Sequence, residues 1–200
     1  RSGDWKARRS MASVELEGKK VGVAAMGNVG SKVARICHDA LGMKVFAFDP
    51  YVKDRFSGFD YTFVDDLTEL FEQSDYISLH LPSTDQTRGV VNRELLSRMK
   101  KEAYLVNTAR GDLINEADLA VALKEGSIGG AALDVFADEP PAADNPLLGL
   151  PNILLTPHVA SLTREVSVKA AVGAAQAVVD FADGKDPEFV VNREVLEEKS

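Results

Sequence analysis

The sequence has one cysteine, Cys37, so it can form no internal disulfide bond. It has no excess of basic residues either, since 23 lysines and arginines stand against 31 aspartates and glutamates. No apolar run approaches the roughly 20 residues that a membrane-spanning helix needs. These absences predict a reducing, cytoplasmic compartment, no nucleic-acid partner and no membrane partner. No metal site is predicted.

The chain also lacks an initial methionine, and no signal-peptide pattern precedes its first apolar run. We therefore expect its 200 residues to be part of a longer polypeptide, and the alternative is a naturally truncated protein. With 45% apolar and 27% charged residues, the chain is long enough to bury a core of its own.

Short apolar runs alternate with stretches of helical spacing from residue 20 onward. The runs at residues 20–25, 45–48, 61–64, 76–81, 103–106, 131–135 and 153–156 are predicted strands, and residues 28–41, 67–71, 92–99, 115–125 and 162–182 are predicted helices. Asn115 is the expected N-cap of the fourth helix, and Gly126 follows its end. Strands that alternate with helices predict a doubly wound α/β domain, with a Rossmann-like parallel sheet and helices on both faces. Residues 189–191 form one further strand-like run.

A glycine-containing turn joins the first predicted strand to the first predicted helix. Gly27 would let the backbone approach a pyrophosphate at the helix N-terminus, and Gly30 would let helix and strand pack closely. Ala25 occupies the place of the first glycine in the usual dinucleotide fingerprint. Because a methyl group disfavours positive φ, alanine is expected to be tolerated at this tight turn only with a negative φ, and the fingerprint is incomplete. The alternative interpretation is that the glycines only pack a tight turn.

Asp49 ends the second predicted strand, 19 residues after Gly30. A carboxylate at this place can accept both hydrogen bonds from an adenosine ribose diol, and it would repel a 2′-phosphate. The sequence therefore favours NAD over NADP as cofactor. The alternative is that Asp49 only caps a loop.

Four further motifs follow in order: HLPSTDQTRG at residues 80–89, VNTARG at 106–111, LDVFADEP at 133–140 and TPHVAS at 156–161. With the glycine turn and Asp49, they closely resemble the NAD-binding domain of the D-isomer-specific 2-hydroxyacid dehydrogenases. The resemblance extends from Trp5 to about Asn192. It implies an oxidoreductase that transfers hydride between NAD(H) and a small 2-hydroxy or 2-keto acid, with Arg110, Glu139 and His158 as catalytic residues.

The same resemblance implies a set of cofactor contacts. The family usually has Arg or His where Asn28 stands, so one cationic contact to the pyrophosphate is absent. The implied contacts are Gly27, Asn28, Val29 and Gly30 for the pyrophosphate, Asp49 and Thr87 for ribose or phosphate, His80 and Pro82 for the cleft wall, Thr108, Ala109, Arg110 and Asp134 for the nicotinamide side, and His158, Ala160 and Ser161 for the far side of the pocket.

The residue types suit this chemistry. Histidine can take and return a proton near neutral pH, a carboxylate such as Glu139 can orient the imidazole of His158, and the planar fork of Arg110 can bind a substrate carboxylate. All three follow predicted strands, at the edge where parallel sheets bind ligands. Taken singly, each is also ordinary: a loop histidine, a surface arginine and a loop glutamate.

The resemblance further implies a division of the chain and an assembly. Residues 1–160 would form the dinucleotide-binding domain with an N-terminal arm, and residues 161–200 a crossing helix and a return segment to an incomplete substrate domain. The strand-like run at residues 189–191 is expected to be frayed or paired abnormally, because its sheet is missing. A homodimer is expected, with the basic arm around Trp5 as a contact, although a frayed terminus explains that arm equally well. The alternative function is an NAD(H)-responsive binding module, similar to the corepressors of the same family, without metabolic turnover.

Overall fold

The computed structural model describes residues 13–52 and 58–192, so the arm around Trp5 lies outside the described residues. The chain divides into two compact units at the bond between Pro157 and His158. The first unit holds the sheet and its helices, and the second holds one long helix and the segment that follows it.

A parallel sheet forms the centre of the first unit, as the alternation of apolar runs predicts. Among the described residues it has seven strands in the order β3-β2-β1-β4-β5-β6-β7. The strands are β1 (Lys20–Ala24), β2 (Lys44–Phe48), β3 (Tyr61–Phe63), β4 (Tyr76–Leu79), β5 (Tyr104–Asn107), β6 (Gly130–Leu133) and β7 (Ile153–Leu155). The chain runs outward from β1 to β3 and then returns to place β4 beside β1. Such a reversal creates a crevice at the carboxyl ends of the two central strands.

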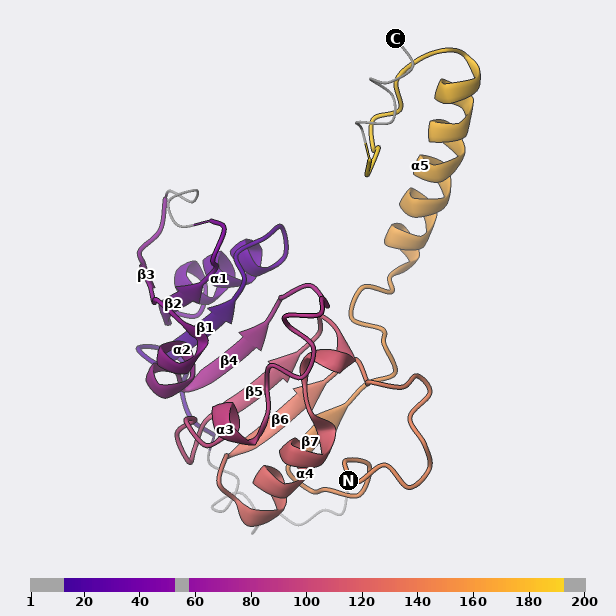
Figure 1. Cartoon of the computed structure of the whole chain (residues 1–200). Helices are drawn as coiled ribbons and strands as arrows, with labels where there is room; N and C mark the ends of the chain where they lie inside the picture. The colour runs from indigo at the N-terminus through magenta and orange to yellow at the C-terminus, as the bar shows by residue number, and fades with distance from the viewer. Residues whose placement is uncertain (1–12, 53–57, 193–200) are drawn as a thin grey trace, which may run out of the picture. The chain divides into compact units, whose positions relative to one another are not determined.

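Two separate apolar clusters show that helices cover both faces of the sheet (Figure 1). Helix α1 (Gly30–Asp39) packs with Ala34 on Val21 and Val23 of β1. The larger cluster holds α2 (Leu67–Gln73), α3 (Arg93–Leu96) and α4 (Glu116–Glu125). The doubly wound α/β fold is therefore confirmed. The central strand β1 is almost entirely buried, whereas Tyr104 of β5 and Leu154 of β7 are exposed.

The ends of the helices follow from capping side chains. Asn115 caps α4 by accepting a hydrogen bond from the amide of Asp118, and Gly126 ends α4 with φ +63°, as predicted. Helix α3 is shorter than the predicted span of residues 92–99. It ends at Leu96, and residues 97–99 form a turn and a bend. A 3-10 turn, η2 (Gly111–Leu113), follows β5.

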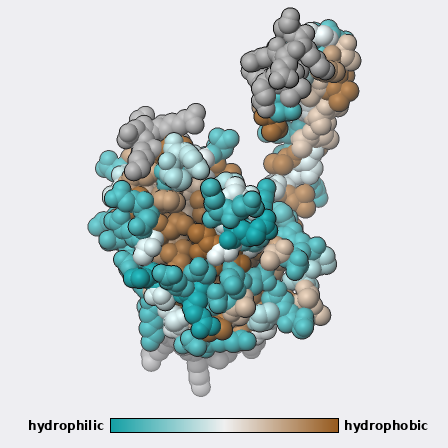
Figure 2. All heavy atoms as spheres, viewed as in Figure 1, coloured by the Kyte–Doolittle hydropathy of each residue, from teal (hydrophilic) through white to brown (hydrophobic). Residues whose placement is uncertain are grey.

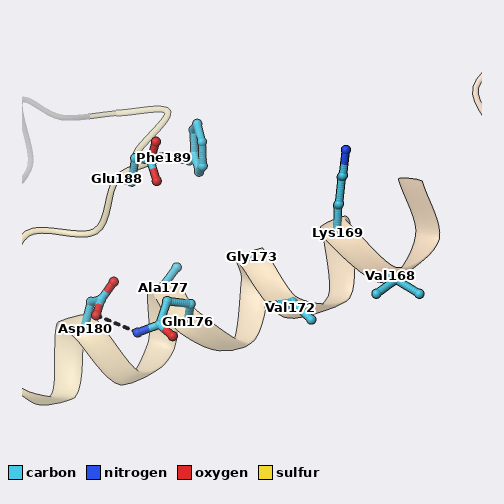
Figure 3. Close-up of a pocket in the computed structure, with 9 residues that line it drawn as sticks. All are labelled: Val168, Lys169, Val172, Gly173, Gln176, Ala177, Asp180, Glu188 and Phe189. Carbon is cyan, nitrogen blue, oxygen red and sulfur yellow. Dashed lines mark hydrogen bonds between the residues drawn. The ribbon is translucent and has the colours of Figure 1, made fainter. Parts of the chain in front are cut away.

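The second unit consists of α5 (Arg164–Ala182) and the segment that runs over one side of it (Figure 3). A groove of about 410 Å³ lies between them, with Val172 on the helix and Phe189 on the segment. The predicted strand-like run at residues 189–191 forms no strand, since this unit offers no strand to pair with among its described residues. The run is therefore unpaired, as expected for a returning strand whose sheet is missing.

Helix α5 buries none of its residues, although alanine and valine occur on several of its sides. Figure 2 shows the apolar residues along it, among which Val172, Val178 and Phe181 are strongly exposed. A helix that is apolar on several sides is normally covered by other protein. Within the described part of the chain, no helix is both long and apolar enough to span a bilayer.

Candidate functional site

The candidate residues of the first unit follow the carboxyl ends of five strands. The turn after β1 carries Gly27, Asn28 and Val29, β2 is followed by Asp49, β4 by His80, Pro82 and Thr87, β5 by Thr108, Ala109 and Arg110, and β6 by Asp134 and Glu139. Because all these strands are parallel, their carboxyl ends share one edge of the sheet. The fold therefore gathers residues that lie far apart in the sequence along one edge, on both sides of the crevice between β1 and β4.

The turn between β1 and α1 is tighter than the sequence suggests. Ala25 adopts φ +78°, which corrects the expectation of a negative φ. Its amide donates to the carbonyl of Phe48 at 2.7 Å, and its own carbonyl lies against Gly30, where an added Cβ would be 2.0 Å from the oxygen. These contacts hold Ala25 in the left-handed region in spite of its methyl group. Gly30 is thus required for close packing.

Unlike Gly30, Gly27 has open space beside it, since an added Cβ would have no heavy atom of the structure within 4 Å. The N-terminus of α1 also differs from the N-termini of the other α-helices. Asp66, Asn92, Asn115 and Thr163 cap the helices that follow them with their side chains, whereas within the described residues no side chain caps α1 at Val29. An open helix N-terminus beside a bare glycine fits the pyrophosphate of a dinucleotide.

Two glycine substitutions separate packing from cofactor binding. Gly30→Ala is expected to destabilise the fold by about 1–3 kcal/mol, because its methyl group would overlap the Ala25 carbonyl. Gly27→Ala is expected to change stability by less than about 1 kcal/mol and to weaken NADH binding about tenfold or more, because its methyl group would stand where the phosphates approach. Thermal unfolding and NADH titration of both variants measure this. Unchanged NADH affinity in Gly27→Ala would contradict the placement of the pyrophosphate.

Asp49 is buried at the end of β2, and both of its carboxylate oxygens accept backbone hydrogen bonds. Oδ2 accepts from the amide of Met26 at 2.8 Å and Oδ1 from the amide of Tyr51 at 2.9 Å. The carboxylate therefore supports the glycine turn directly. Each oxygen retains a second lone pair that a ribose hydroxyl can use, so loop support and ribose binding are compatible.

The segment after β4 is held by its own side chains. His80 places Nε2 2.9 Å from the hydroxyl of Ser78, and burial lowers the pKa of its imidazole, which favours the neutral form. Pro82 is exposed. The hydroxyl of Thr87 donates to the carbonyl of Pro82 at 2.6 Å and accepts from the amide of Thr84 at 2.8 Å. In this structure Thr87 thus orders its own loop, and its contact with a cofactor stays a prediction.

The turn after β5 presents Arg110 at the surface. Thr108 is exposed and Ala109 half-buried, and Arg110 donates from Nη1 to the carbonyl of Ala109 at 2.6 Å. Asn107, which is buried, holds this turn from inside: its Oδ1 accepts from the Ala109 amide at 3.0 Å and its Nδ2 donates to the Arg110 carbonyl at 2.8 Å. The arginine is therefore mounted on a turn of fixed shape.

The segment after β6 carries two of the candidate acids, one buried and one exposed. Asp134 is 4% exposed, and its Oδ1 accepts from the hydroxyl of Thr156 at 2.6 Å, which links the ends of β6 and β7. Glu139 is exposed, and its Oε1 accepts from the amide of Phe136 at 3.0 Å. The glutamate is thus anchored to the turn that carries it.

His158, Ala160 and Ser161 open the second unit. All three are exposed, and His158 adopts φ +54°, a left-handed conformation that is uncommon outside glycine and that asparagine, aspartate and histidine adopt more often than other residues. The two units are described separately, so the pairing of His158 with Glu139 stays a prediction.

Three residues that organise the edge have no role in the sequence-based assignment. Asn107 holds the arginine turn, Asp112 accepts from the hydroxyl of Ser83 at 2.6 Å and from Arg88 at 2.9 Å, and Glu116 accepts from the amide of Ala137 at 2.8 Å. Asp112 and Glu116 join loops that follow different strands. Asn107 lies inside a recognised motif, which was the available signal, whereas the other two depend on contacts that no local pattern reveals.

Comparison with known proteins identifies the family. Residues 1–160 match the D-isomer specific 2-hydroxyacid dehydrogenase NAD binding domain. The glyoxylate reductase of Aeropyrum pernix is 42% identical over an alignment that covers 98% of this chain, and the D-3-phosphoglycerate dehydrogenase of Methanocaldococcus jannaschii is 42% identical over 95%. The chain therefore belongs to the D-isomer-specific 2-hydroxyacid dehydrogenase family, which confirms the resemblance.

The solved structures agree with this assignment. The crystal structure of D-lactate dehydrogenase with NAD+ from Lactobacillus jensenii matches 91% of this chain with a TM-score of 0.84 and 31% identity. The chain spans 60% of the Aeropyrum glyoxylate reductase, 36% of the Methanocaldococcus enzyme and 58% of the Lactobacillus one.

Proposed function

We propose that the full-length gene product is an NAD-dependent dehydrogenase or reductase of small 2-hydroxy and 2-keto acids, and that this chain supplies its cofactor site. The observation that carries the proposal is the shared sheet edge, where an uncapped helix with a bare Gly27, the buried Asp49 and the rigidly mounted Arg110 lie in one unit. The names of the relatives, glyoxylate reductase and D-3-phosphoglycerate dehydrogenase, support this substrate class.

The roles of the catalytic residues follow from their chemistry. Arg110 binds the substrate carboxylate and the C2 oxygen through its guanidinium. His158 takes the hydroxyl proton during oxidation and returns it during reduction, and Glu139 orients the imidazole and stabilises its protonated form. The bound nicotinamide supplies or accepts the hydride. Asp134 and the backbone of Thr108 and Ala109 hold the nicotinamide side of the cofactor, and Ala160 and Ser161 close the pocket beside His158.

A substrate panel tests this proposal. The full-length protein is assayed by NADH absorbance with glyoxylate, hydroxypyruvate, 3-phosphohydroxypyruvate and pyruvate, and with the matching 2-hydroxy acids in the reverse direction. Turnover of at least one member supports the proposal. NADH binding without turnover of any member would favour the alternative, an NAD(H)-responsive binding module, which no observation on the described residues supports at present.

Asp49 is expected to give a clear preference for NADH over NADPH, because a 2′-phosphate beside its carboxylate is repelled. Asp49→Asn removes the negative charge and keeps an acceptor for only one of the two loop amides, while its NH2 group faces the other amide. It is expected to narrow the preference for NADH over NADPH and to cost some stability. Asp49→Ala also leaves the Met26 amide without its acceptor and is expected to cost about 1–3 kcal/mol. Titration of both cofactors measures the preference. Equal affinities in the unsubstituted protein would overturn the assignment.

The remaining proposals concern organisation. We propose that residues 1–160 are the dinucleotide-binding domain and that 161–200 lead into the substrate domain, which would cover the exposed valines of α5. We also propose a homodimer, for which sedimentation analysis at micromolar concentration is the test, with a monomeric mass as the contrary result. A cytoplasmic location is proposed because the single thiol of Cys37 suits a reducing compartment.

A further inference from the structure

We infer that Asn107 is the positioning residue of the substrate-binding arginine, an inference that rests on the function proposed above. Both polar atoms of its side chain are used within the next three residues. Oδ1 accepts from the amide of Ala109 at 3.0 Å, and Nδ2 donates to the carbonyl of Arg110 at 2.8 Å. The side chain of Asn107 thus fixes the turn at two points, the amide of Ala109 and the carbonyl of Arg110.

Burial makes this arrangement stiff. Asn107 is 0% exposed, so water cannot replace either hydrogen bond if the turn changes shape. A buried amide group that loses its partners is costly, because its donor and acceptor then lack both protein and solvent. The turn can therefore relax only at the expense of the Asn107 side chain.

The guanidinium is linked to the same turn. Nη1 of Arg110 donates to the carbonyl of Ala109 at 2.6 Å, and the amide of that same alanine is the group that Asn107 holds. Any rotation of the Ala109 peptide groups would thus shift the support of the guanidinium. The direction in which Arg110 points depends on Asn107, although Asn107 itself is buried beneath the turn.

The main chain of Asn107 extends this control to the neighbouring strand. Its carbonyl accepts from the amide of Asp134 at 3.0 Å, and Asn107 pairs with Leu133 in the register of β5 and β6. Asn107 is therefore hydrogen-bonded both to the turn that carries Arg110 and to Asp134, the acid proposed to hold the nicotinamide side. A change at Asn107 is expected to affect substrate binding first and cofactor binding less, because both hydrogen bonds of its side chain are made with the arginine turn.

An asparagine that bonds to its own backbone is also a common local support, so the test must separate positioning from support. The full-length gene product is used, and Asn107→Ser shortens the side chain while keeping a hydroxyl. We expect the KM for the 2-keto acid to rise about tenfold or more, within the ~100-fold that a misplacement of 1 Å can cost. The dissociation constant for NADH is expected to change less than about threefold. Asn107→Asp keeps the shape and the acceptor but loses the donor, and it is expected to raise KM as well.

A double-substitution cycle with Arg110→Ala decides how Asn107 acts. If Asn107 works through the arginine, Asn107→Ser adds less than about twofold to KM once Arg110 is absent, since coupled residues are not additive. The matched control is Asn152→Ser, which removes an asparagine donor to the carbonyl of Leu123 before β7 begins, at the opposite edge of the sheet. It is expected to lower the melting temperature without changing KM. Additive effects of Asn107→Ser and Arg110→Ala would overturn the inference.

Failure of the proposed function can be distinguished from failure of the inference about Asn107. Absence of turnover in the unsubstituted protein would overturn that function, and amide hydrogen exchange would then decide the positioning role. Asn107→Ser is expected to accelerate exchange at Ala109 while the amides of the central strands keep their protection. Unchanged exchange at Ala109 would overturn the inference with no need for an active enzyme.

Discussion

Replacement of His158 by alanine in the full-length protein is expected to lower turnover by about 10²–10⁴-fold, because it removes the group proposed to exchange a proton with the substrate oxygen. NADH affinity is expected to change little. Arg110→Ala is expected to raise KM as well as to lower turnover, since its guanidinium is the group proposed to bind the substrate carboxylate. Steady-state kinetics of both variants, with NADH binding measured separately, distinguish the two roles.

The left-handed backbone conformation of His158 requires a second variant that removes the imidazole without adding backbone strain. With φ +54°, alanine at this position would add backbone strain to the loss of the imidazole. Asparagine tolerates the left-handed region better, so His158→Asn removes the imidazole with less strain. Both variants are expected to lose turnover to a similar extent. Near-normal turnover in His158→Asn would show that the conformation matters and that another group is the base.

The second large effect is expected for the 200-residue chain itself, which should bind NADH but scarcely turn over. The turn at Gly27, the carboxylate of Asp49 and the segment that carries Asp134 all lie in its first unit. Catalysis also needs a closed cleft that holds the substrate against the nicotinamide and excludes water. Correct orientation of reactants contributes roughly 7–11 kcal/mol to lowering a barrier, so we expect turnover to be about 10³-fold or more below that of the full-length protein.

The comparison uses both polypeptides under identical conditions. NADH affinity is measured by fluorescence titration, and reduction of the best substrate of the panel is followed by absorbance. We expect dissociation constants that agree within about tenfold and turnover numbers that do not. Comparable turnover would mean that the 200 residues contain the whole site and that no further part of the protein is needed to close the cleft.

Much of the fold could be predicted from the sequence because its signals are local. Buried runs such as that of β1 alternate with stretches of helical spacing, and the caps at Asn115 and Gly126 are properties of single residues in a short window. The order of the motifs was enough to indicate the family. The run at residues 189–191 shows the limit of local reasoning, since a strand exists only when another strand pairs with it.

Tertiary structure decided what the sequence left open at the site. Ala25 takes a positive φ because its amide meets Phe48 from β2 and its carbonyl meets Gly30, and these contacts outweigh the preference of alanine. The sequence by itself placed Asp49 after a strand, but only the structure joins it to the amide of Met26, 23 residues earlier. Composition and spacing determine which elements form. Which donor meets which acceptor at the sheet edge depends on the packing of strands distant in sequence, and that is a property of the folded chain alone.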